Sequence, residues 1–315
     1  MWLRRAGTGD FPATLTEQAV ATLCGIQAGD STPVASLTYL EDFGKLPPGY
    51  CLRADPVHLR ADTSGLILFD AAAFELGDQE SCALSGALAN HLAEDGWQLR
   101  QHHPHRWYLV GGEPQDLATL ALPAVRGTPV PAVPFSGADA AAWISRLNEL
   151  QMLLHSHPAN RARAARAPVA VNSLWLWGGG EPQHRGSAAC GRVLSDNPFA
   201  RGSAHYCGLE ALPRPAAAEQ ATPVDNGLLV VLEDCRDAAA YQDLPAWRAA
   251  VQRLEHDWFQ ALIRSLKAGK LDALDLYPVN GRVYRLTRRR LAAFWKGRGD
   301  YRGDRAFRDA GLTRV

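Results

Sequence analysis

The chain has no uninterrupted apolar run of the roughly 18 residues that a transmembrane helix needs, so its sequence predicts no membrane span. Its first five residues, Met1 to Arg5, do not lead into the apolar segment that a signal peptide requires. No two of the six cysteines form a Cys-x-x-Cys pair, which argues against a zinc ribbon or a thioredoxin motif. By default we expect a cytoplasmic protein that contacts no membrane.

Several common signatures of function are also absent. Lysine plus arginine and aspartate plus glutamate both number 33, so the formal net charge is zero. A general nucleic-acid-binding protein carries a basic excess, and we therefore expect no nucleic-acid partner. The sequence has no Gly-x-Ser-x-Gly elbow, no P-loop and no glycine-rich dinucleotide fingerprint after a strand.

Residues 51–135 carry the pattern of an α+β subdomain. The predicted order of strand, strand, helix, strand, strand is typical of one compact unit rather than of successive strand–helix–strand crossovers. Residues 1–50 are weakly patterned, and we expect them to pack on the core as an N-terminal segment. The predicted elements are a hairpin over 57–69, a helix over 79–94, and strands over 97–101 and 106–110.

Residues 136–315 predict an α/β domain with a mostly parallel central sheet and flanking helices. The stretches 172–177 and 227–232 have apolar side chains on both faces, as the inner strands of a parallel sheet do. Apolar residues that recur every three or four positions predict helices over about 139–157 and 244–268.

The most distinctive stretch runs from residue 148 to residue 180. It predicts a helix that ends at Pro158, an arginine-rich connector, a buried strand, and a glycine turn at residues 178–180. Polar groups would then lie at the carboxyl end of a strand, where open α/β sheets bind ligands. The alternative interpretation is a capped helix, a solvated arginine loop and a tight turn without a ligand.

The polar residues of this stretch suit an anionic ligand. Guanidinium and amide groups donate hydrogen bonds to phosphate or carboxylate oxygens, and glycine amides can approach such oxygens unobstructed. The candidate ligand-binding residues are His157, Asn160, Arg163, Asn172, Gly178 and Gly180.

Three acidic residues follow the predicted strand over 227–232. Glu233, Asp234 and Asp237 are placed where catalytic or metal-binding carboxylates commonly lie in α/β enzymes. They would equally suit the first turn of a helix. The sequence leaves both interpretations open.

Two motifs resemble the core of archaeal-type cofactor-independent phosphoglycerate mutases, which are members of the alkaline phosphatase superfamily. Residues from about 50 to 296 are also similar to short bacterial relatives, described as phosphoglycerate mutase-like or as regulatory proteins of pathogenicity-factor type. The resemblance implies a reduced alkaline phosphatase-like fold and a substrate-like pocket, and it adds Trp177 to the candidate ligand-binding residues. The motifs are His157-Pro158-x-Asn160-x-x-Arg163 and Asn172-Ser173-x-Trp175-x-Trp177-Gly178-x-Gly180.

The resemblance also implies two divalent metal ions and a serine nucleophile, but most of the residues that would supply them are not found. The family's Asp-Gly-x-x-Asp after its opening strand, the serine that follows it and the late Asp-His-Gly motif are missing. One metal-ligand motif is similar to residues 237–243, with Tyr241 in place of the ligand histidine. A neutral phenol (pKa about 10) is a poor metal ligand, so Asp237 is a weak candidate, and we expect no cofactor unless a site for Mn or Mg survives.

We therefore predict a degenerate, metal-less relative, a pseudoenzyme, that binds a small phosphorylated or carboxylated ligand and has a regulatory role. No catalytic residue is identified. The first alternative is a regulatory module whose tryptophan-rich surface binds a protein partner. The second is an active phosphoglycerate mutase or phosphatase with a rebuilt metal site.

Overall fold

The computed structural model describes residues 6–27, 32–63, 65–131, 133–166, 169–182 and 184–292. Its contacts divide the chain into two compact units. One unit is Leu15–Leu254, and the other combines Met1–Thr14 with Glu255–Val315. Within the described ranges, no helix has both the length and the apolar character that crossing a membrane would take.

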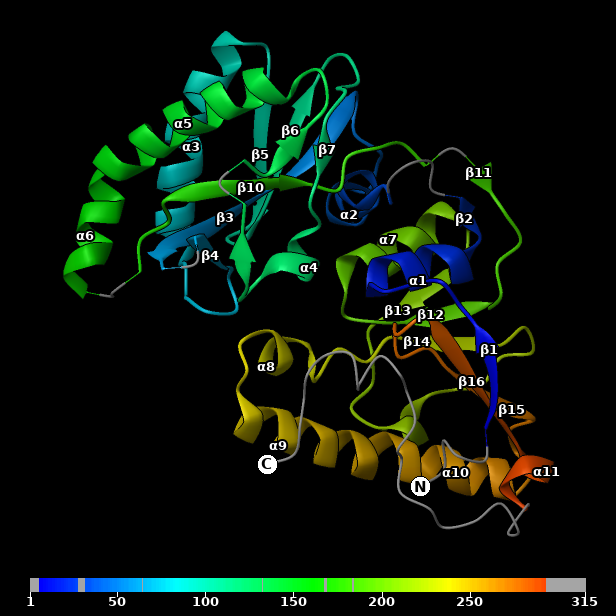
Figure 1. Ribbon diagram of the computed structural model, residues 1–315. Coiled ribbons are helices and arrows are strands. Elements are labelled where there is room, and N and C mark those ends of the chain that lie inside the picture. The colour runs from blue at the N-terminus through cyan, green and yellow to red at the C-terminus, as the bar shows by residue number, and fades with distance from the viewer. Residues whose placement is uncertain are drawn as a thin grey trace. The chain divides into compact units, whose positions relative to one another are not determined.

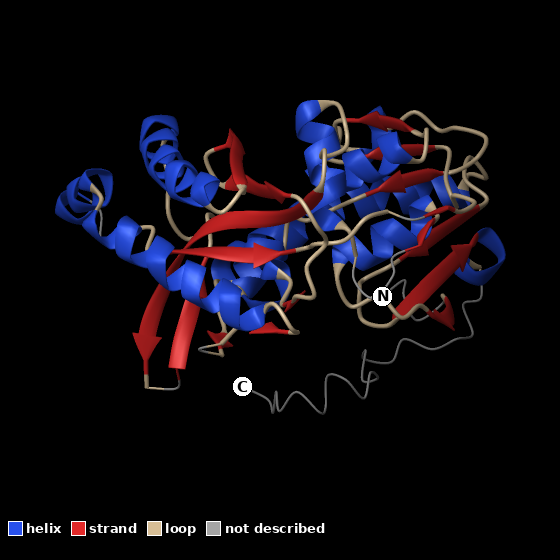
Figure 2. Ribbon diagram, turned by 90° about the horizontal axis from the view of Figure 1, so that it is seen from above, coloured by secondary structure: helices blue, strands red, loops and turns tan. Residues whose placement is uncertain are grey.

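The largest sheet of the Leu15–Leu254 unit is antiparallel (Figures 1 and 2). Its longest strand, β3 (Tyr50–Asp62), pairs with β6, β10 and β4 along successive parts of its length. The predicted hairpin over 57–69 and the two strands after the first helix of the subdomain are confirmed. The other strands are β4 (Gly65–Phe69), β5 (Gln98–His103), β6 (Arg106–Gly111), β8 (Pro129–Val130) and β10 (Ser173–Trp177).

The prediction that residues 172–177 lie in a mostly parallel central sheet is wrong. Strand β10 runs antiparallel to β3, with Trp177 opposite Arg53 and Ser173 opposite Val57. All five side chains of β10 are buried because the strand is covered on both faces. Apolar residues on both faces of a strand indicate that both faces are buried. An antiparallel strand can be buried on both faces just as a parallel strand can.

Two long helices cover one face of this sheet (Figure 1). Helix α3 (Asp78–Glu94) and helix α5 (Ala140–Ser156) confirm the predictions over 79–94 and 139–157. Their leucines form one apolar cluster with Leu174 and Leu176 of β10. Helix α6 (Pro158–Arg166) continues the chain after α5 and leads toward β10.

Three shorter helices lie beyond the opposite face of the sheet. These are α1 (Thr16–Cys24), α2 (Val34–Phe43) and α7 (Pro198–Tyr206). Helix α2 packs on β3, α7 packs on α2, and α1 packs on α7. Trp175 and Trp177 of β10 join Phe199 of α7 in a second apolar cluster. Helix α1 ends at Gly25, whose φ of 77° suits the left-handed C-cap conformation.

A small parallel sheet completes the larger unit and confirms part of the parallel prediction. Strand β12 (Arg192–Leu194) lies between β13 (Glu210–Leu212) and β14 (Leu228–Val230), and both pairings are parallel. Helix α7 connects β12 to β13. The remaining elements of this unit are β2 (Ile26–Gln27), β7 (Ala118–Thr119), α4 (Leu122–Val125), β9 (Phe135–Ser136), β11 (His184–Arg185), α8 (Arg236–Ala240) and α9 (Leu244–Leu254), with a 3-10 turn at Ala218–Gln220.

The smaller unit is an antiparallel sheet with helices. Strand β16 (Arg282–Thr287) lies between β1 (Gly7–Asp10) and β15 (Ala273–Leu276), and both pairings are antiparallel. The helix predicted over 244–268 is formed by α9, a π-helical segment (Glu255–Phe259) and α10 (Gln260–Lys267) in succession. Helix α11 (Arg288–Leu291) is the last described element.

Candidate functional site

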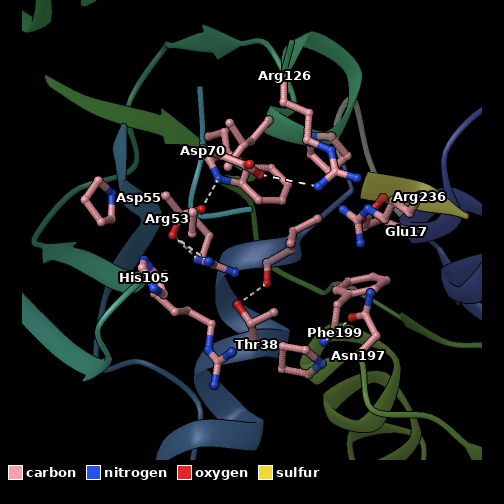
Figure 3. Close-up of a pocket in the computed structure, with 18 of the residues that line it drawn as sticks. Glu17, Thr38, Arg53, Asp55, Asp70, His105, Arg126, Asn197, Phe199 and Arg236 are labelled. Carbon is pink, nitrogen blue, oxygen red and sulfur yellow. Dashed lines mark hydrogen bonds and ion pairs between the residues drawn. The ribbon is translucent and has the colours of Figure 1, made fainter. Parts of the chain in front are cut away.

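A cavity of about 370 Å³ lies within the Leu15–Leu254 unit, and every residue that lines it belongs to that unit (Figure 3). Its wall carries balanced charge. Among the described residues, four arginines line it: Arg53, Arg106, Arg126 and Arg236. Four acidic residues line it as well: Glu17, Asp55, Asp70 and Asp237.

One side of the cavity lies at the carboxyl ends of the parallel strands β12 and β14. Asn197 follows β12 and caps α7, because its Oδ1 accepts a hydrogen bond from the backbone N–H of Phe199 at 2.8 Å. Glu233 and Arg236 lie in the segment that follows β14. This is the position at which α/β sheets commonly bind ligands.

The antiparallel sheet supplies a buried ion pair. Arg53 and Asp55 lie two apart on β3 and therefore share one face of the strand. Arg53 donates to Asp55 Oδ1 from Nε at 3.1 Å and from Nη2 at 2.5 Å. Trp177 donates to the other carboxylate oxygen from its indole N–H at 2.7 Å. The Arg53 guanidinium also lies over the rings of Tyr108 and Trp177, at 5.4 and 5.5 Å from their centroids.

Arg126 is held between two carboxylates from distant parts of the sequence. Its Nη1 donates to Asp237 Oδ1 at 2.6 Å and lies 3.4 Å from Asp70 Oδ2. The Tyr241 hydroxyl donates to Asp70 Oδ1 at 2.6 Å and accepts from the Asp70 backbone N–H at 2.9 Å. Burial and the neighbouring carboxylate raise the pKa of Tyr241, which keeps the phenol protonated. Arg126 is 6% exposed.

Arg236 is held between two carboxylates in a similar manner. It donates from Nη1 to Glu233 Oε1 at 2.5 Å and from Nη2 to Glu17 Oε1 at 3.3 Å. Asn197 donates to the second oxygen of Glu233 at 2.9 Å. Glu17 is only 4% exposed, and burial raises its pKa although Arg236 opposes that shift. Figure 3 shows Glu17 beside Arg236 at the wall of the cavity.

These contacts test whether the wall suits the two divalent metals that the resemblance implies. The space that a metal between Asp70 and Asp237 would take holds the Arg126 guanidinium. Tyr241 lies where the resemblance would place a histidine ligand. Within the described residues, no group of three or more histidine, cysteine, aspartate or glutamate side chains could hold a metal ion. The described residues of this wall therefore do not fit a divalent metal.

The polar groups of the 157–172 motif bind the protein's own backbone. Asn160 donates to the carbonyls of Leu154 and Val171 at 2.8 and 2.7 Å and accepts from the Val171 N–H at 3.1 Å. Asn172 accepts from the Leu59 N–H at 2.7 Å and donates to the Leu59 carbonyl at 2.8 Å. The Asn172 side chain therefore makes two hydrogen bonds to the backbone of β3 just before β10 begins.

Arg163 also binds atoms of the fold. It donates to Glu80 Oε2 at 2.5 Å, to the Glu75 carbonyl at 2.6 Å and to the Val169 carbonyl at 3.2 Å. It is 4% exposed. None of these motif residues with polar side chains is among the described residues that line the cavity.

The other predicted residues divide into two groups. His157 ends α5, and its Nδ1 accepts from the Ala159 N–H at 3.2 Å. The carbonyls of Gly178 and Gly180 accept from the Ala35 N–H and the Ser36 hydroxyl, each at 2.8 Å, so this turn positions the start of α2. By contrast, Trp177 and Asp237 line the cavity.

Sequence reasoning missed most of the cavity wall. Arg126 lies in a proline-rich connector, and Asp70 follows a hairpin, so neither belongs to a spaced motif. Arg236 stands directly beside Asp237, which the family motif did identify. The signal available in the sequence was that alignment, since it pointed to Asp237 and Tyr241 together.

The sequence is similar to that of a known protein over about half of its length. No family model matches the chain. Over 166 residues it is 25% identical to the probable 2,3-bisphosphoglycerate-independent phosphoglycerate mutase of Geobacter sulfurreducens, a match that covers 51% of this chain and 42% of that protein. Over about half of its length the chain is therefore similar in sequence to a cofactor-independent phosphoglycerate mutase. The resemblance inferred from the two motifs is thus confirmed.

Two solved structures show limited similarity to the chain, and one of them is a cofactor-independent phosphoglycerate mutase. The cofactor-independent phosphoglycerate mutase from Thermoplasma acidophilum DSM 1728 has a TM-score of 0.39 at 18% identity, covering 80% of this chain and 74% of that one. The PH0037 protein from Pyrococcus horikoshii has a TM-score of 0.42 at 10% identity, covering 81% and 68%. The sequence match spans less than half the length of the Geobacter mutase, so that enzyme's activity does not follow from it.

Proposed function

We propose that this protein is a degenerate relative of cofactor-independent phosphoglycerate mutases that binds a small phosphorylated or carboxylated ligand without divalent metals. The observation that carries the proposal is the position of Arg126, whose Nη1 lies between Asp70 and Asp237. A fixed guanidinium there supplies the positive charge that a metal would otherwise bring to the cavity. Arg236, between Glu17 and Glu233, repeats the arrangement.

Arginine suits this task because its planar group carries five N–H donors. Arg236 binds Glu233 through Nη1 and Glu17 through Nη2, and each of these nitrogens carries two hydrogens. Donors therefore remain for the oxygens of an anionic ligand, and bidentate contacts of this kind are charge-assisted. A phosphoglycerate is the ligand to try first, because the sequence relative is a phosphoglycerate mutase.

The charge state of Glu17 supports an anionic ligand. With all four lining acids ionised, the charges of the described wall cancel, four against four. Burial raises the pKa of Glu17, so its neutral form is favoured more than that of an exposed glutamate. Each proton taken up by the wall leaves a net positive charge for the ligand. A regulatory role, with ligand occupancy as the signal, is consistent with a site that binds and does not react.

The alternative of a tryptophan-rich docking surface gains no support from the motif itself. Trp175 and Trp177 are 3% and 4% exposed. Both lie in the apolar cluster under the sheet rather than on a surface. They cannot meet a protein partner without disrupting that cluster.

A thermal-shift titration tests ligand binding. Purified full-length protein in EDTA is titrated with 3-phosphoglycerate and, as the uncharged control, with glycerol. A ligand that binds only the native state adds about 2.7 kcal/mol at a hundredfold its dissociation constant, which we expect as a rise of several degrees with 3-phosphoglycerate alone. Equal curves with both compounds, or no rise with any phosphorylated or carboxylated compound tested next, would contradict the proposal.

A further inference from the structure

The formal net charge of zero is the sum of two opposite charges, one for each compact unit. The Leu15–Leu254 unit contains 17 lysines and arginines against 25 aspartates and glutamates, and the smaller unit contains 16 against 8. Their formal charges are therefore −8 and +8. A charge asymmetry of this kind between parts of one chain is typical of contact with a polyanion. The expectation of no nucleic-acid partner rests on the neutral whole chain and does not apply to the smaller unit by itself.

The composition of the smaller unit narrows the kind of polyanion. Thirteen of its 16 basic residues are arginines, whose planar guanidinium makes paired hydrogen bonds to phosphate oxygens. Among the described residues, the large apolar side chains that are exposed all belong to the other unit. A membrane-binding surface needs such side chains to enter the lipid. The two observations together favour a soluble chain of phosphates over a lipid surface.

One face of the three-stranded sheet in this unit carries two arginines. Gly7 of β1 lies opposite Arg285 of β16, and residues opposite each other in an antiparallel pair project to the same face. The space into which a Cβ of Gly7 would project holds the Arg290 guanidinium. Leu286, the next residue of β16, projects to the other face, where it packs with Ile263 of α10. Arg285 and Arg290 therefore lie together on the face that is turned away from α10.

Both arginines keep donors for a ligand. The Arg285 side chain is 64% exposed, and its Nε lies 3.0 Å from Asp275 Oδ1. This ion pair orients the guanidinium and does not use its two terminal nitrogens, which carry four N–H groups. Arg290 is exposed as well. The face can thus donate several hydrogen bonds to phosphate oxygens.

An aromatic pair lies at one end of the same sheet. Phe11 and Tyr277 are the residues directly after β1 and β15, and their ring centroids are 4.6 Å apart. Both side chains are half-buried, so part of each stays open to solvent. Burial and the Asp275 carboxylate raise the pKa of Tyr277 while Arg285 opposes the shift, as expected for a phenol near that ion pair. Aromatic rings beside arginines are the combination on which single-stranded nucleic acids bind, since bases stack and phosphates pair with the charges.

We propose that this face of the smaller unit binds single-stranded nucleic acid. Arg285 and Arg290 hold phosphates of the strand, and a base rests against the Phe11–Tyr277 pair. A duplex keeps the faces of its bases stacked on each other, so it can use the arginines but not the rings. None of these four described residues lines the cavity, so the inference does not depend on the proposed ligand.

Fluorescence anisotropy of labelled oligonucleotides tests the proposal. Full-length protein is titrated into oligouridylate, oligothymidylate and a DNA duplex, each of about 15 nucleotides per strand, at salt concentrations from about 50 to about 200 mM. We expect both single strands to bind more tightly than the duplex, with an affinity that falls as the salt concentration rises. The tighter of the two single strands identifies RNA or DNA as the natural partner.

Three variants locate the contact. Arg285→Ala should lower the slope of log affinity against log salt by about 0.7, the value for one phosphate contact with a single strand. Phe11→Leu should keep the slope and weaken binding by about tenfold, because it removes a stacking ring without changing a charge. Arg161→Ala is the matched control, since Arg161 is an exposed arginine on α6 of the other unit. It removes the same charge and should change neither the affinity nor the slope.

Two results with the wild-type protein would overturn the proposal. In one, neither single strand binds at about 50 mM salt. In the other, the duplex binds as tightly as the single strands, or polyglutamate or phosphatidylserine vesicles displace them, which would mean a general anion-binding or membrane surface. The wild-type measurements alone decide, so a variant that fails to fold does not leave the question open. Equal effects of Arg285→Ala and Arg161→Ala would contradict the placement of the contact on this face.

Discussion

The 157–180 motif and the cavity wall use polar side chains in opposite ways. In the motif, Asn160 and Asn172 hydrogen-bond backbone groups of neighbouring segments, and Arg163 binds two carbonyls and one carboxylate. In the cavity wall, Arg126 binds Asp237, and Arg236 binds the distant Glu17 as well as the nearby Glu233. The first arrangement fixes the fold, and the second builds a charged surface around an opening.

The difference explains why the polar residues Asn160, Arg163 and Asn172 of the more distinctive stretch do not line the cavity. Side chains that replace backbone hydrogen bonds need a fixed spacing, because the groups they serve are at fixed positions. Charges that meet across a cavity need no such spacing. The contrast predicts that variants of the motif change stability, whereas variants of the wall change ligand binding.

The largest effect is expected from Arg163→Ala. Its guanidinium is almost fully buried, so its removal takes one donor away from the Glu80 carboxylate and from two backbone carbonyls. We expect a loss of about 3–5 kcal/mol in the free energy of unfolding, measured by urea denaturation. Arg146→Ala is the control, because Arg146 pairs with an exposed Asp95 and should cost less than about 1 kcal/mol. Equal losses of unfolding free energy in the two variants would contradict the structural role assigned to Arg163.

The next effect is expected from Arg236→Ala in ligand binding. If the proposed function holds, its donors contribute about 1.5–3 kcal/mol to the binding of an anionic ligand, so affinity falls by about tenfold to a hundredfold. Calorimetric titration of folded protein with 3-phosphoglycerate measures the change. Arg192→Ala is the matched control, since Arg192 pairs with Glu210 outside the cavity wall. An unchanged affinity in Arg236→Ala would remove this residue from the site.

The smallest expected effect is a pH dependence of anion binding that results from the protonation of Glu17. Because burial raises the pKa of Glu17, the wall gains positive charge as the pH falls through that value, and anion binding becomes tighter. Affinity should change by at most about tenfold per pH unit, and it should weaken again as the pH rises. Sulfate is the probe, because its own charge is constant from pH about 5 to about 8.

Glu17→Gln separates this residue from the other titrating groups. Residue 17 of this variant is neutral at every pH, so its sulfate affinity should depend less on pH than that of the wild-type protein, while the buried Asp55, whose pKa is also raised, still titrates. A variant that keeps the full wild-type pH profile would assign the titration to another group.

The sequence predicted the elements of the larger unit better than their pairing. Apolar spacing correctly predicted helices α3 and α5 and the β3–β4 hairpin, because spacing follows directly from helix and strand geometry. It could not give the direction of β10, since burial on both faces is the same for parallel and antiparallel neighbours. Strand direction depends on long-range contacts that hydrophobic patterning does not encode.

The cavity was predictable only in part for a related reason. The resemblance pointed to Asp237 and Tyr241 because both fall within one short stretch that is similar to a metal-ligand motif of the mutases. Arg126 and Asp70, by contrast, come from a connector and from the end of a hairpin, and only the fold brings them together. The single observation that best supports metal-free binding thus lies in residues without a local signature.

A calorimetric titration of the wild-type protein with 3-phosphoglycerate, once in EDTA and once in excess Mn²⁺, tests the central claim most directly. If the Arg126 guanidinium supplies the positive charge in place of a metal, the two dissociation constants should agree within about twofold, a difference of about 0.4 kcal/mol. Binding that appears only with Mn²⁺ would contradict the account, because the carboxylates around Arg126 would then have to serve a metal after all.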